Sequence, residues 1–170
     1  MKLVLSAIVA TALLATQGDS LVLHPLMKDV VAAQAQVLWD IGNRAMDDDG
    51  NPSAKNLMPA DWPRLAAAAQ AMKDASNKLA TASRIVVASP GEKIQDEGTS
   101  GSATAAQIQQ FIDGDKVGFA QHARALAGVA DEFGRAAKAK DVKTLFNASG
   151  RLDEICEGCH LKFWYPSQGK

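Results

Sequence analysis

The sequence predicts an all-α fold, an antiparallel four-helix bundle. In four segments, apolar residues recur at intervals of three and four positions, which is the spacing of an α-helix with one buried face. Alanine, the strongest helix former, is abundant in all of them. No segment alternates apolar and polar residues for long enough to indicate a strand. Four amphipathic helices joined by loops bury their apolar faces against one another, which gives a bundle.

The first helix is expected to begin near Pro25, since proline suits the first turn, where its missing N–H would have no partner. It is expected to end at the acidic, glycine- and proline-containing stretch 47–52. Its predicted apolar stripe is Leu23, Leu26, Met27, Val30, Val31, Leu38, Ile41 and Ala45.

The second helix is expected to have Asp61 as its N-cap and Pro63 in its first turn, and to end before Ser89-Pro90-Gly91. Its predicted stripe is Leu65, Ala69, Met72, Ser76, Leu79, Ser83 and Val86. The polar stretch 92–102 is expected to be a loop.

The third helix is expected to start near Thr104, to be irregular at 113–115 and to continue to Ala137. Asp141 is expected to cap the fourth helix, which Pro166 limits. One face of the fourth helix is predicted to carry Val142, Leu145, Ser149, Leu152, Cys156, Cys159 and Phe163.

The motif Cys156-Glu157-Gly158-Cys159-His160 carries the chemistry of the chain. Two thiols and an imidazole at this spacing are what covalent haem attachment requires: each thiol forms a thioether with a haem vinyl group, and the histidine coordinates the iron. On a helix the three side chains share one face. The chain has two cysteines in all, and both belong to this motif. A thioredoxin-like pair would need a preceding strand, and a zinc site would need more ligands than His24 and His122 readily supply.

Residues 1–20 are predicted to be an export signal, because one lysine is followed by an apolar run from Leu3 to Ala15 that is too short to span a bilayer comfortably. An uncleaved anchor is the alternative, since no clean cleavage site follows the run. No later apolar stretch is long enough for a membrane span. An exported chain with this motif is expected in the bacterial periplasm, carrying one covalently attached haem c.

Residues 21–170 have the length of one domain with one core. The 18 basic and 19 acidic residues give no basic field, so no nucleic acid partner is expected. Partners are expected to dock through local patches. The acidic run 47–49 lacks the spacing of a calcium loop, and no nucleophile motif or phosphate-binding glycine loop is present, so the chain is not expected to be an enzyme.

A haem motif on the last helix of an exported chain of this length resembles the class II cytochromes c, which comprise cytochrome c′ and its low-spin, methionine-ligated relatives. The resemblance is concentrated in 156–160, in the preceding Gly150-Arg151-Leu152 and in Leu26-Met27-Lys28-Asp29. It implies a monohaem bundle domain over 21–170, with periplasmic redox proteins as partners. A homodimer is one arrangement that the resemblance permits, because such bundles often pair through their first two helices.

The resemblance also implies that Met27 is the sixth iron ligand beside His160, since low-spin members place methionine in this segment. The alternative for Met27 is core packing, for which thioethers are well suited. His24, at the expected helix boundary, is expected to be solvated or to cap the helix, and His122 is expected to be a structural histidine. Cytochromes c′ typically carry a basic residue four positions after the ligating histidine, whereas this chain has Trp164.

Two functions follow from these residues. A haem with two fixed axial ligands suits single-electron transfer, because its geometry changes little on reduction. A haem with an open sixth position would instead bind small gases such as nitric oxide or carbon monoxide. A bound Met27 sulfur favours the first function and an empty sixth position favours the second.

Overall fold

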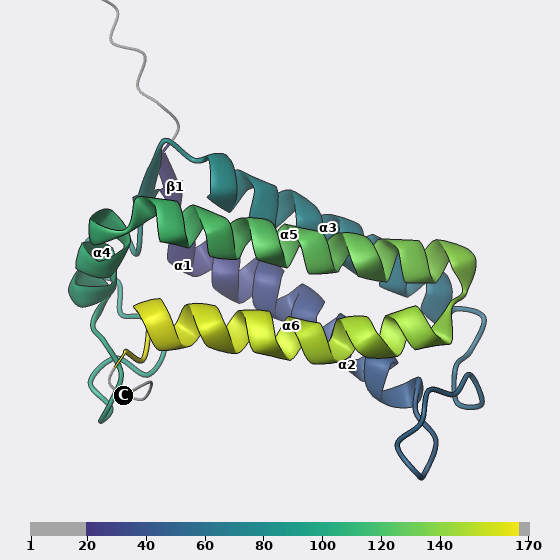
Figure 1. Ribbon diagram of the computed structural model, residues 1–170. Coiled ribbons are helices and arrows are strands. Elements are labelled where there is room, and N and C mark those ends of the chain that lie inside the picture. Colours follow the sequence, from purple (N-terminus) through teal and green to yellow (C-terminus); the bar gives the residue numbers. More distant parts are fainter. Residues whose placement is uncertain (1–19, 167–170) are drawn as a thin grey trace, which may run out of the picture.

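The computed structural model describes residues 20–166, and in this range the chain is mostly helical, which confirms the all-α prediction. The predicted export signal, apart from Ser20, lies outside the described residues. Figure 1 shows long helices lying side by side, with one short helix across one end. The elements are β1 (Ser20–Val22), α1 (Leu23–Pro25), η1 (Leu26–Val31), α2 (Ala32–Arg44), α3 (Asp61–Thr81), β2 (Arg84–Val86), α4 (Ala105–Gly114), α5 (Lys116–Ala139) and α6 (Val142–Phe163).

The predicted first helix is one helical rod in which η1 is a π-helical stretch. Its wider turn is visible in the backbone bond from the N–H of Ala32 to the carbonyl of Met27, five residues earlier. π-helical turns are rare and are frequently found at functional sites. Met27 therefore lies on the one part of this rod where the regular α-helical spacing is interrupted.

The second helix ends earlier than predicted. Residues Ser83 and Val86 were expected on its stripe, but α3 ends at Thr81 and the chain turns at Ala82, whose ψ is 130°. Ile85, Val86 and Val87 are β-branched and favour extended backbone, and Arg84–Val86 pairs in parallel with Ser20–Val22. The expectation that no strand would form is wrong for these two short segments, which are too brief to alternate visibly in sequence.

The predicted starts of α4 and α6 and the predicted irregularity at 113–115 agree with the structure. Thr104 caps α4 through a capping box with Gln107, and Asp115 separates α4 from α5 and accepts a bond from the N–H of Gly118. The irregularity predicted at 113–115 is therefore a break between two helices. Asp141 caps α6 by accepting bonds from the N–H groups of Lys143 and Thr144.

The apolar side chains form two clusters. The first lies between α2, α3, α5 and α6 and includes Leu38, Leu65, Met72, Phe133 and Leu145. The second gathers at the end of the helices where α4 and the small sheet lie, and it includes residues from α3, α4, α5 and α6. Leu26 and Met27 pack against both clusters. Within residues 20–166 no helix combines the length and apolarity that crossing a membrane requires.

Asp61 is fully buried and does not cap α3 as predicted, because Ala60 occupies the N-cap position. One carboxylate oxygen of Asp61 accepts a bond from the guanidinium of Arg44 at 2.6 Å, and the other accepts one from the N–H of Met58 at 2.8 Å. Burial would raise the pKa of Asp61, but the bonds to Met58 and Arg44 outweigh it and lower the pKa below its usual value of 3.8. Asp61 therefore ties the end of α2 to the start of α3.

Replacing Asp61 by alanine should lower the free energy of unfolding at pH 7 by about 2–3 kcal/mol, because two buried bonds to a charged group are lost. Since the pKa of Asp61 is lowered by folding, its contribution is present above pH ~4 and is lost as the pH falls further. Urea unfolding measured between pH 7 and pH 3 should therefore show a weaker acid dependence for Asp61→Ala. Asp49→Asn, in an exposed loop, is the control and should change stability by less than ~0.5 kcal/mol.

Candidate functional site

An apolar cavity lies at the α4 end of the long helices. Its volume is about 110 Å³. Its walls come from the first helical rod, the end of α3, the residues around β2, and α4, α5 and α6. The apolar wall residues are Leu23, Val31, Leu79, Val87, Ile94, Ile108, Ile112, Phe119, Ala123, Leu126, Ile155 and Phe163.

Hydrogen bonds between segments that are distant in the sequence fix the wall of the cavity that His24 and Val87 line. The N–H of His24 donates to the carbonyl of Val87 at 2.9 Å and so continues the pairing of β1 with β2. The side chain of Gln109 from α4 accepts from the N–H of Val87 and donates to the carbonyl of Ile85. The first helical rod, the segment after α3 and α4 are thus joined around the cavity.

All four residues predicted to hold a cofactor line this one cavity: Cys156, Cys159 and His160 from α6 and Met27 from η1. Residues separated by more than 120 positions in the sequence are thereby brought to the same space. Their role as haem and iron ligands stays a prediction. Met72 is instead buried in the core, as its place on the predicted stripe of the second helix indicated, and Met58 is exposed in a loop.

Both cysteines are free thiols. Burial, aided by the charge of Asp153, raises the pKa of Cys156 to about 11. Burial, aided by Cys156, raises the pKa of Cys159 to about 12, although Lys162 opposes the shift. The thiols are therefore protonated at neutral pH and present apolar sulfur to the cavity.

Burial lowers the pKa of His160, so its imidazole is neutral at pH 7 and has the form that binds a metal ion. The indole of Trp164 packs against it edge to face, with 5.1 Å between ring centroids. Trp164 in turn stacks on Tyr165 at 5.3 Å, and the hydroxyl of Tyr165 donates to Asp96 at 3.2 Å. These aromatic rings limit how far the imidazole of His160 can turn.

His24 also lines the cavity, which differs from the predicted solvated or capping position. Its Nδ1 lies 2.7 Å from a carboxylate oxygen of Glu92, and the other oxygen of Glu92 accepts from the N–H of Ser89. The carboxylate accepts from the imidazole, so Nδ1 carries the proton and Nε2 is the second nitrogen of the ring. The spacing of His24 and Met27, three residues apart, was the signal in the sequence that both face the same side.

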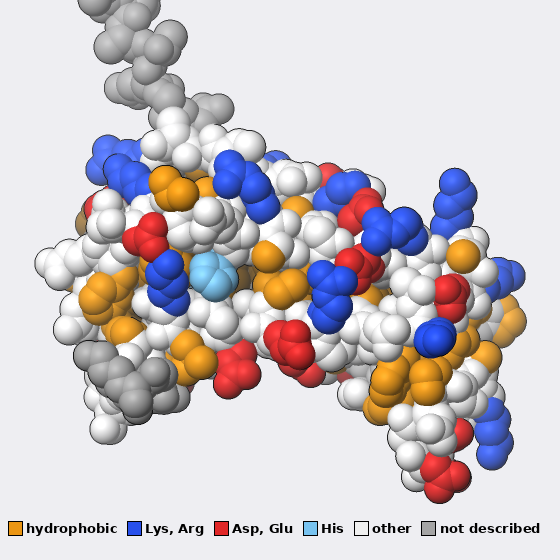
Figure 2. Space-filling model, in the orientation of Figure 1, with side chains coloured by type: hydrophobic (Ala, Val, Ile, Leu, Met, Phe, Trp, Pro, Cys, Tyr) orange, Lys and Arg blue, Asp and Glu red, His pale blue; other side chains and the backbone are white. Residues whose placement is uncertain are grey.

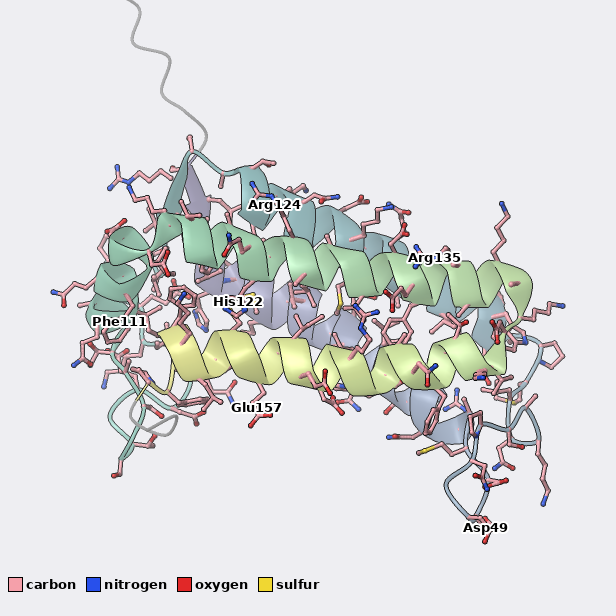
Figure 3. All side chains as sticks on the ribbon, in the orientation of Figure 1. Asp49, Phe111, His122, Arg124, Arg135 and Glu157 are labelled. Atoms are coloured by element: carbon pink, nitrogen blue, oxygen red, sulfur yellow. The ribbon has the colours of Figure 1, made fainter. Side chains whose placement is uncertain are left out.

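His122 from α5 is the third histidine at the cavity. Figure 3 shows it in the seam between α5 and α6, whereas Glu157, in the middle of the cysteine motif, points away. The ring of Phe163 packs edge to face against it at 6.0 Å. Burial, helped by the positive charge of Lys162, lowers the pKa of His122, although Asp115 opposes this. Lys162 and Asp115 form an ion pair at 2.5 Å beside it.

The outer surface of α6 is acidic beside the cavity. Figure 2 shows Asp and Glu side chains along this edge of the molecule, and Asp153, Glu154 and Glu157 are all exposed. Hydrophobic side chains are visible in the seam between α5 and α6. Within residues 20–166 no three His, Cys, Asp or Glu side chains form a cluster that could hold a metal ion by itself.

No model of a known protein family, no curated protein and no solved structure matches this chain. The residues of the cavity therefore carry the functional conclusion.

The chain without a cofactor should react slowly with iodoacetamide. A pKa of about 11 for Cys156, against a usual value of 9.0, lowers the thiolate fraction at pH 8 about 100-fold, and Cys159 should react more slowly still. Mass spectrometry of the alkylated protein measures this rate. The control is the same chain unfolded in about 8 M urea, where both thiols are exposed to the reagent. Equal rates with and without urea would contradict the buried thiols.

Proposed function

We propose that this chain is an exported monohaem c-type cytochrome of four-helix-bundle architecture that transfers single electrons between periplasmic redox proteins. The observation that carries the proposal is the convergence of two protonated thiols, a neutral imidazole and a thioether in one apolar cavity. The donor set fits a haem: the thiols suit thioether bonds to its vinyl groups, and imidazole and thioether are ligands that low-spin haem iron takes.

The four residues would have separate roles. Cys156 and Cys159 would hold the haem covalently on α6, His160 would bind its iron on one side, and Met27 would bind it from η1. When bound, the haem supplies an iron that takes up and gives back one electron. The apolar walls exclude water around it, and burial together with methionine ligation favours the reduced iron and raises the reduction potential.

The rigidity of the cavity supports electron transfer. Its ligand candidates come from helices that are fixed at several points, by the strand pairing near His24 and by the aromatic contacts of His160. Ligands that stay in place when the oxidation state changes keep the reorganisation small, which a carrier needs. The acidic edge formed by Asp153, Glu154 and Glu157 lies on the helix that would carry the haem, and it suits a partner with a basic patch.

A second candidate function is the binding of small gases at an open sixth position. The observation that favours it is His24, whose ring lines the cavity and is oriented by Glu92. A polar group beside the sixth position stabilises a bound gas molecule by hydrogen bonding. The two functions differ in one quantity, the occupancy of the sixth position by Met27.

The matured protein should contain one covalently bound haem. Its optical spectrum, recorded oxidised and reduced and with and without carbon monoxide, should be low-spin and unaffected by the gas. His160→Ala should change both the spectrum and the reduction potential, because one axial ligand is lost. An unchanged spectrum in His160→Ala, or a chain without covalent haem after maturation, would contradict the proposal.

Met27→Ala should convert the low-spin centre to a high-spin centre that binds carbon monoxide, because the sixth position opens. Met58→Ala is the matched control, since Met58 is 55% exposed in a loop, and its spectrum should equal that of the parent protein. If Met27→Ala keeps the parent spectrum, Met27 is not a ligand. If the parent protein itself is high-spin and binds carbon monoxide, the gas-binding function is favoured instead.

A further inference from the structure

The loop between β2 and α4 supplies part of the cavity wall. Figure 1 shows it leaving β2 and passing the C-terminal end of α6 before the chain enters α4. Residues 92–100 of this loop form turns, and Ile94, their one large aliphatic side chain, is buried and lines the cavity. A wall with so little apolar contact is held in place weakly.

Hydrogen bonds tie this segment to the two elements that carry the ligand candidates. Glu92 accepts from the ring of His24, in the first helical rod, at 2.7 Å. Asp96 accepts from the hydroxyl of Tyr165, at the end of α6, at 3.2 Å. Both bonds are exposed to solvent, where water can replace either partner, so each adds only modestly to the hold on the segment.

The segment can move as one piece. Within residues 92–100, hydrogen bonds join positions three apart, so these turns do not depend on the rest of the molecule. Gly91 and Gly101 flank it with φ of 79° and 88°, a backbone region that glycine adopts readily, and small residues suit hinges. Just outside these glycines the chain is fixed, at Val87 by backbone and side-chain bonds and at Ala103 by a backbone bond of 3.0 Å.

The size of the cavity requires a wall to move. A volume of about 110 Å³ is below the range of about 300–1,000 Å³ of sites for small molecules and cofactors, and a haem is a large, flat macrocycle. The helical walls are packed into the two apolar clusters, and the pairing of β1 with β2 fixes the start of the first rod. Residues 92–100 are therefore the wall that can move outward with the smallest loss of contact.

We propose that residues 92–100 form a movable cover, which turns away from the cavity about Gly91 and Gly101 and gives a cofactor access to Cys156 and Cys159. The choice of haem as that cofactor rests on the proposed function. The motion is a property of the chain and can be measured without haem. When the cover opens, Ile94 leaves the wall, and both thiols, which line the same cavity, become reachable from solvent.

The first test uses the full chain without cofactor. Iodoacetamide alkylates its thiols in a series of urea concentrations below the unfolding transition, and mass spectrometry measures the rate. Opening of the cover exposes little surface, so the rate should hardly depend on urea in this range. A rate that follows the fraction of unfolded chain at every urea concentration would mean that the thiols are reached only by global unfolding, and would overturn the proposal.

Two variants loosen the cover. Tyr165→Phe removes the hydroxyl that bonds to Asp96, keeps the ring and changes no charge. The loss of one hydrogen bond should raise the alkylation rate at low urea about 3–10-fold, because the cover is open more of the time. Glu92→Ala, which removes the bond to His24, should have an effect of similar size. Unchanged rates in both variants would contradict the cover.

Asp61→Ala is the matched control. It destabilises the whole chain through the contact between α2 and α3, which stays intact when only the cover opens. The free energy of unfolding should therefore fall, while the alkylation rate at low urea stays that of the parent chain. If Asp61→Ala speeds alkylation by as much as it raises the unfolding equilibrium constant, the thiols are exposed by global unfolding and the cover is overturned.

Added haem tests the entry of the cofactor. Its association with the chain, followed by absorbance, should be about 3–10-fold faster in Tyr165→Phe and unchanged in Asp61→Ala, because opening of the cover precedes entry. Equal association rates in Tyr165→Phe and the parent chain would overturn the cover as the route.

The outcomes separate the two proposals. If alkylation shows the local opening but the matured chain carries no covalent haem, the proposed function fails and the cover stands. If the matured chain carries haem but its thiols, before attachment, are reached only by global unfolding, the cover is overturned and the proposed function stands.

Discussion

The pairing of β1 with β2 holds the first helical rod against the segment that follows α3, and the wall of the cavity opposite α6 depends on it. Each strand has three residues, yet the N–H of His24 extends the ladder to Val87, and the side chain of Gln109 bonds to the backbone of Ile85 and Val87. Helix packing alone would leave the start of this rod free to slide along its neighbours. The strand register fixes its position along the axis, and with it the positions of His24 and Met27.

The helices could be predicted from the sequence because their signals are local. The spacing of apolar residues, the caps at Thr104 and Asp141 and the break near Asp115 all act within a few residues of the chain, and the structure agrees with each. The two strands could not be predicted, since each is stabilised by a partner more than 60 positions away. Asp61 was predicted to be a helix cap because its bond to Arg44 could not be seen in the sequence. That bond depends on how α2 and α3 meet in space.

The site was predictable in part. The spacing of Cys156, Cys159 and His160 is a chemical signature that needs no fold, whereas Met27 was selected through a family resemblance. The structure adds His24 and His122 to the same cavity, and it does so through contacts that the sequence does not record, such as the bond of His24 to Glu92. The π-helical turn at Met27 also gave no signal, because nothing in the sequence of Leu26–Val31 distinguishes a π-helical turn from an α-helical one.

The two apolar clusters differ in how they are completed. The cluster around Phe133 and Leu38 is closed by protein side chains, whereas the cluster around Phe119 and Phe163 surrounds the cavity. Because side chains that border an empty cavity lack neighbours on one side, we expect local opening at that end, in the chain without cofactor, to cost less free energy than opening at the other end. Under the proposed function, this end of the chain would open before the cofactor is attached, and a haem-attachment enzyme would reach the buried thiols without unfolding the whole domain.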